Sequence, residues 1–193
     1  MGTTWLFNVL KEIATVTGTP TEVVADNVPP PEPSWSGSVL IKAHRADPVE
    51  LVRRFESKIS LIACVMVRDA VPTFRSLVRT QTAGRNDLLD WLERDLSSYE
   101  RTLPDLTRVA VLHEQWIAGD ASRLIGHLSR FLLTPVTEDD AHKIADRFRR
   151  EHVRDLVRKL DAESDWTGDF RNFDTETQWH AGHIGPEHEQ DPE

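Results

Sequence analysis

The sequence is poor in cysteine, in long apolar runs and in positive charge. Cys64 is the only cysteine among the 193 residues, so no disulfide can form within the chain, which favours a reducing compartment. No apolar run reaches the roughly 18 residues of a membrane-spanning helix. The first residues also lack the basic segment of a signal peptide. These absences predict a cytoplasmic protein with no membrane partner.

Acidic residues outnumber basic ones by 32 to 23, which gives a formal net charge of −9. A nucleic-acid surface normally carries an excess of Lys and Arg, so we expect no nucleic-acid partner. A small polyanion is a different case, because a few basic side chains gathered at one place are enough to hold it. The apolar share of 39% suffices for the core of one domain.

Strands and helices alternate along the predicted chain. Strands are expected over residues 38–41, 60–67 and 109–112. Helices are expected over residues 3–16, 47–57, 69–80, 87–101, 120–132 and, with a break left open, 138–160. This alternation predicts an α/β fold, a three-layer domain with a mostly parallel central sheet flanked by helices. We expect residues 1–160 to form the domain and 161–193 an irregular acidic C-terminal tail.

The chain opens with the tetrapeptide Gly2-Thr3-Thr4-Trp5 at the start of the first predicted helix. A helix N-terminus offers unpaired N–H groups and a partial positive charge to phosphate or sulfate. Gly2 permits an anion to approach the backbone closely, and the Thr3 and Thr4 hydroxyls can donate to its oxygens. Trp5 offers an aromatic face on which an adenine could stack. The alternative is an ordinary capped helix with a tryptophan in the core.

Two basic residues, Lys42 and His44, stand two apart at the end of a predicted strand, so their side chains point the same way. A histidine there could take a proton from an acceptor, and a lysine could offset charge on a transferring group. The alternative is a solvent-facing basic strand end.

Arg68 follows the next predicted strand, at the sheet edge where ligands usually bind, and Ser76 comes eight residues later. A guanidinium grips phosphate through two parallel hydrogen bonds, and Ser76 is close enough to share that phosphate. The alternative is a surface arginine paired with Asp69 and a solvent-facing serine.

In this order, the three fragments resemble the sulfotransferases that use PAPS (3′-phosphoadenosine 5′-phosphosulfate). The tetrapeptide is similar to the end of the family's loop Pro-Lys/Arg-Ser-Gly-Thr-Thr-Trp, and Lys42-Ala43-His44 is similar to its Lys-Thr-His segment. The resemblance implies that Gly2, Thr3 and Thr4 hold the 5′-phosphosulfate and that Trp5 stacks on adenine. It also implies that Lys42 stabilises the bridging oxygen, that His44 is the base, and that Arg68 and Ser76 bind the 3′-phosphate.

The resemblance continues downstream and has two gaps. His113 occupies the place of an adenine-contacting tyrosine, and residues 177–184 are similar to a tail segment of bacterial members. The family's first strand and the Pro-Lys/Arg-Ser half of the loop are missing before Gly2, so the domain looks N-terminally incomplete. Residues 185–191 are acidic where the family has a basic phosphate loop.

By resemblance, the expected enzyme is a P-loop-like, PAPS-dependent sulfotransferase, which transfers a sulfuryl group to a hydroxyl or amine of a small-molecule or carbohydrate acceptor. Its product from PAPS is PAP, the 3′,5′-bisphosphate. The alternative is a catalytically impaired relative that binds PAP or a similar nucleotide. No metal is expected, since His180, His183 and His188 lie in an acidic tail without a cysteine. A homo-oligomer is left open.

Overall fold

The computed structural model describes part of the chain, and residues 109–162 are its longest continuous stretch. The described residues are 2–24, 38–42, 62–67, 69, 71, 74, 86–87, 89–90, 93, 97, 109–162, 177 and 179. The helices are α1 (Gly2–Val16), α5 (Gln115–Gly119), α6 (Ala121–Phe131), α7 (Glu138–Arg147) and α8 (Arg150–Ala162). The strands are β1 (Thr21–Val24), β2 (Ser38–Ile41), β3 (Ala63–Val67) and β4 (Val109–His113).

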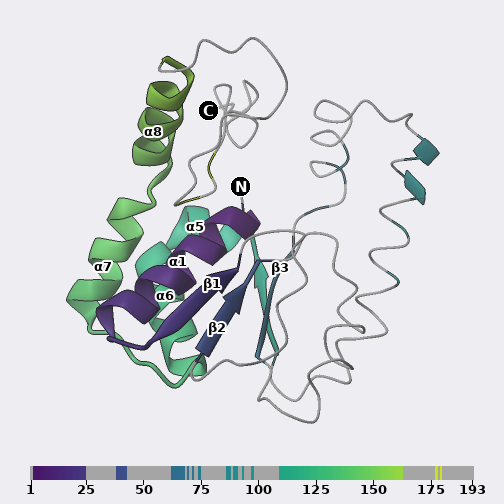
Figure 1. Cartoon of the computed structure of the whole chain (residues 1–193). Coiled ribbons are helices and arrows are strands. Elements are labelled where there is room, and N and C mark those ends of the chain that lie inside the picture. The colour runs from purple at the N-terminus through teal and green to yellow at the C-terminus, as the bar shows by residue number, and fades with distance from the viewer. Residues whose placement is uncertain are drawn as a thin grey trace.

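All four described strands pair in parallel. In one two-stranded sheet β1 pairs with β2, with Thr21 opposite Ser38; in the other β3 pairs with β4, with Ala63 opposite Val109. Parallel neighbours require long crossover connections, which agrees with the wide separation of paired strands in the sequence. Mixed helices and short parallel strands confirm the general α/β character. In Figure 1, α1 lies beside β1, β2 and α7, and α6 packs against α7.

The first helix ends as its sequence predicts. Gly18 adopts a φ of 64°, the left-handed conformation that glycine reaches without a steric penalty. Its N–H donates to the Thr15 carbonyl at 3.1 Å, and the Thr19 N–H donates to the Ala14 carbonyl at 2.9 Å. These two bonds form a Schellman motif, which satisfies carbonyls that the helix leaves open. The predicted helix over residues 3–16 is therefore confirmed, with Gly2 added at its start.

The helices after β4 also follow the apolar spacing. Asp120 caps α6, as its carboxylate accepts the Arg123 N–H, so the helix expected over residues 120–132 is confirmed. The region expected over 138–160 divides into α7 and α8 at Phe148 and Arg149. Two short elements were not predicted, the strand β1 and the five-residue helix α5.

The core contains residues of α1, β4, α6, α7 and α8 and the ring of Trp179. Its buried members are Trp5, Leu6, Val9, Ile13, Leu112, Leu124, Ile125, Leu128, Ala141, Ile144, Phe148, Val153, Val157 and Trp179. At the edge of this core, Arg147 Nη1 donates to both carboxylate oxygens of Glu12 at 2.9 Å, which joins α7 to α1. No helix among the described residues is long and apolar enough to cross a membrane.

Several predicted elements fall wholly or partly outside the described residues. The helix expected over 47–57 does so completely. Of the helices expected over 69–80 and 87–101, only scattered residues are described, and Val71, Phe74 and Asp87 among them are helical. The strand expected from residue 60 begins at Ala63.

Candidate functional site

The first turn of α1 and the end of β2 meet in the interior of the protein. Thr4 lies in that turn and is 1% exposed, and Lys42 directly follows β2 and is 6% exposed. The Lys42 ammonium donates to the Thr4 hydroxyl Oγ1 across 3.2 Å. Figure 1 places the N-terminus at the end of the sheet toward which β2 points. Two residues 38 positions apart, both expected at one anion site, are thus in direct contact.

The Lys42 side chain is held by an aromatic ring as well. Its Nζ lies 5.8 Å from the centroid of the Phe7 ring, within the range of a cation–π contact. Phe7 belongs to α1 and is itself buried. The interpretation of Lys42 as a solvent-facing basic group is therefore wrong, because its charge lies inside the protein beside the helix start.

The Lys42 ammonium lies beside the positive end of a helix dipole. The aligned peptide dipoles of an α-helix place about half an elementary positive charge at the N-terminal end. The first turn of α1 contains no acidic residue, and the Lys42 ammonium reaches the Thr4 hydroxyl in that turn. An ammonium, a hydroxyl and the N–H groups of a first turn can all donate to the oxygens of an anion.

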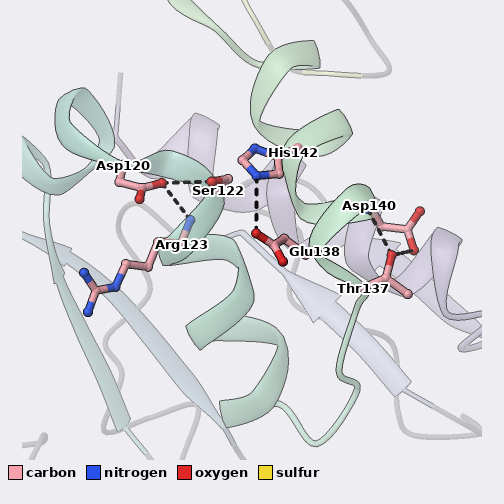
Figure 2. A network of polar contacts seen from close by, with 7 residues as sticks. All are labelled: Asp120, Ser122, Arg123, Thr137, Glu138, Asp140 and His142. Atoms are coloured by element: carbon pink, nitrogen blue, oxygen red, sulfur yellow. Dashed lines mark hydrogen bonds and ion pairs between the residues drawn. The ribbon is translucent and has the colours of Figure 1, made fainter.

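The starts of α6 and α7 show the usual arrangement for comparison. The Asp120 carboxylate accepts the Arg123 N–H at 2.9 Å and the Ser122 hydroxyl at 2.8 Å (Figure 2). At α7, Thr137 accepts the Asp140 N–H, and the first turn contains three carboxylates, those of Glu138, Asp139 and Asp140. Acidic side chains therefore lie at the starts of both α6 and α7, whereas the first turn of α1 itself contains none.

The remaining residues of the predicted tetrapeptide lie in the same turn. Gly2 begins α1, and Thr3 is half-buried. Trp5 is 3% exposed and belongs to the core cluster. This burial fits the core tryptophan that the sequence left open, and its stacking on an adenine stays a prediction.

His113 belongs to a second polar cluster, at the carboxyl ends of β3 and β4. The Gln115 N–H donates to His113 Nδ1 at 3.3 Å, so in the neutral ring Nε2 carries the proton. That Nε2 lies 3.4 Å from Asp69 Oδ1, and Gln115 Nε2 donates to Asp69 Oδ2 at 3.0 Å. The ring is therefore fixed in orientation at the edge of this sheet. Its predicted contact with adenine is untested.

Three residues of the predicted site, His44, Arg68 and Ser76, lie outside the described residues. The same holds for the tail histidines His180 and His183. Within the part of the chain that the structure describes, no group of three or more His, Cys, Asp or Glu side chains is placed to hold a metal ion.

Two residues beside the site were not predicted from the sequence. Asn8 lies one turn after Thr4 in α1, is 2% exposed, and donates from Nδ2 to the Thr4 carbonyl at 2.9 Å and to the Thr177 carbonyl at 2.7 Å. Trp179 is 1% exposed and belongs to the core cluster. The sequence did indicate that Asn8 is buried, because it lies between Phe7 and Val9 in a segment that is apolar on every side of the helix.

Comparison with known proteins leaves the family open, since no protein-family model and no curated protein matches the sequence. The resemblance to sulfotransferases therefore depends on the motif residues alone. Of these, the structure brings Thr4 and Lys42 into contact.

Proposed function

We propose that this protein is a PAPS-dependent sulfotransferase with a P-loop-like α/β fold, which transfers a sulfuryl group to a hydroxyl or amine of a small-molecule or carbohydrate acceptor. The observation that carries the proposal is the contact between the buried Lys42 ammonium and the Thr4 hydroxyl at the start of α1. A hydroxyl, an ammonium and the N–H groups of a first turn fit the oxygens of a phosphosulfate.

The donors of the site also suit an anionic ligand. A phosphosulfate at this place would accept from the Lys42 ammonium and interact favourably with the positive end of the α1 dipole at once. The acidic balance of the whole chain does not oppose this, because screening limits the reach of exposed charges to about 10 Å.

PAPS supplies an activated sulfuryl group, and the residues of the chain bind it and move a proton. His44 takes the proton of the acceptor hydroxyl or amine as the acceptor atom bonds to sulfur. Thr3, Thr4 and Lys42 stabilise the negative charge that develops as the bond from sulfur to the bridging oxygen breaks. The electron pair of that bond leaves with PAP, whose 3′-phosphate is held by Arg68 and Ser76.

Titration calorimetry with PAP tests the binding half of the proposal. We expect wild-type protein to bind PAP and Lys42→Met to bind it about tenfold or more weakly, because a hydrogen bond to a charged group contributes about 1.5–3 kcal/mol. Methionine keeps the length of the lysine stem and so preserves most of the packing. The matched control is Lys159→Met, on an exposed position of α8, which should bind as the wild type does. Equal affinities of wild type and Lys42→Met would contradict the site.

Turnover of PAPS against a panel of phenols, amines and sugars tests the catalytic half. His44→Ala should abolish transfer with PAP affinity nearly unchanged, because it acts on the acceptor. Arg68→Ala should weaken PAP binding by about 1.5–3 kcal/mol. If the wild type binds PAP and transfers to no acceptor, the chain is instead a nucleotide-binding relative without catalysis.

A further inference from the structure

The Asn8 side chain joins two distant parts of the chain at the candidate site. Its Nδ2 group has two hydrogens, and the two carbonyls that accept from it belong to Thr4 and Thr177, the second 169 residues away. Because Asn8 is almost fully buried, both bonds are shielded from water. Loss of the Asn8 amide would remove two hydrogen bonds from the interior, one within α1 and one to Thr177.

The segment around Thr177 is anchored a second time, by a tryptophan. The Trp179 ring lies in the same core cluster as Trp5 and Leu6, and its backbone N–H donates to the Thr177 hydroxyl at 3.4 Å. Residues 177 and 179 are thus fixed against the first two turns of α1 by a buried ring and by the Asn8 amide.

Thr4 is consequently held from two sides. Its hydroxyl accepts from Lys42 at the end of β2, and its carbonyl accepts from Asn8, which is bonded to Thr177. A binding group that is already fixed in its bound geometry loses less entropy when the ligand binds. A binding group that is misplaced contacts the ligand poorly, so the protein binds that ligand more weakly.

We propose that Asn8 is a positioning residue of the anion site: it fixes the first turn of α1 against the segment that contains Thr177 and Trp179, so that PAP affinity depends on a side chain that does not touch the ligand. This inference rests on the proposed function. It assigns the C-terminal segment a part in the site through a named amide.

The test compares the PAP affinity of Asn8→Leu with that of the wild type. Leucine has nearly the shape of asparagine and is neutral, so it removes both hydrogen bonds without changing the charge near the site. We expect PAP affinity about tenfold below the wild type.

Glu12→Gln is the matched control for stability. Glu12 lies one turn further along α1 and bonds Arg147, so its loss weakens the helix packing without affecting Thr4. We expect this variant to lower the thermal midpoint and leave PAP affinity unchanged. Asn8→Leu with wild-type affinity would overturn the inference and leave the proposed function intact.

Amide hydrogen exchange without ligand separates the two proposals. In Asn8→Ala, a peptide that contains residues 177–179 should exchange at least about tenfold faster than in the wild type, because its anchor to α1 is lost. Unchanged exchange would overturn the inference whatever PAP does. If exchange rises and the wild type does not bind PAP, the proposed function fails, and the role of Asn8 at that site fails with it.

Discussion

Lys42 and Asn8 show how buried polar side chains define the candidate site. Sequence patterns placed Thr4 and Lys42 together because both match the motifs of one family, and their contact agrees with that placement. The residues alone favoured an exposed Lys42, since a lysine at a strand end is usually solvated. Asn8 was not predicted, because the partner of its amide is a backbone carbonyl 169 residues away, which no local pattern encodes.

A pH-dependent contribution to stability is predicted at Asp120. The Arg123 N–H, and then the Ser122 hydroxyl, hold the pKa of this carboxyl below its ordinary value of 3.8. A lowered pKa means that the ionised form is favoured in the folded state, so the contribution is present above pH 3.8 and is lost as the pH falls through the folded-state pKa. We expect Asp120→Asn, which keeps the cap shape, to have a lower thermal midpoint than the wild type at about pH 7. The difference should shrink as the pH falls below 3.8 and through the folded-state pKa, and a constant difference would contradict the assignment.

At the scale of elements, long apolar patterns were predictable and short elements were not. The helix over 3–16 and the strand over 38–41 have clear periodicity and turn residues at their ends, and both are confirmed. The strand β1 has four residues, one of them charged, and depends on its pairing with β2. The predicted start of β3 at residue 60 was three residues early, because an apolar run indicates burial and does not mark where the ladder of hydrogen bonds begins.

The cap of α7 gives a prediction at this scale. Thr137 Oγ1 accepts the Asp140 N–H at 3.1 Å and donates to the Asp140 carboxylate at 2.7 Å. Thr137→Ala should lower the free energy of unfolding by about 1 kcal/mol, the usual cost of losing an N-cap. Thr137→Ser keeps the hydroxyl and should stay within a few tenths of a kcal/mol of the wild type. Urea unfolding measures both, and equal losses in the two variants would assign the effect to the methyl group.

At the scale of the whole molecule, the C-terminal segment contributes to the core through one ring. The sequence indicated an irregular acidic tail after residue 160, and composition alone cannot show that one tryptophan within it is buried. Trp179 packs with residues of α1, β4, α6, α7 and α8 in a single cluster. The placement of such a ring depends on tertiary packing, which local propensity does not contain.

Removal of that ring should destabilise the protein strongly. Trp179→Ala is expected to lower the free energy of unfolding by about 3–5 kcal/mol, the range for a large aromatic side chain lost from a core. Trp116, which is 54% exposed, provides the control, and Trp116→Ala should change stability by about 0.5 kcal/mol or less. Chemical unfolding followed by far-UV circular dichroism compares the two. Similar small losses would show that residue 179 is not part of the core.

The bond between Asn8 and Thr177 has a consequence for biosynthesis. At about 5–20 residues per second, a ribosome adds the 169 residues between them in roughly 10–30 s. For much of that interval α1 lies outside the ribosome without Trp179, one of its core neighbours. The nascent chain therefore exposes apolar surface of α1 until residue 179 has been added, and chaperones that bind such surface should matter most for its yield during that interval.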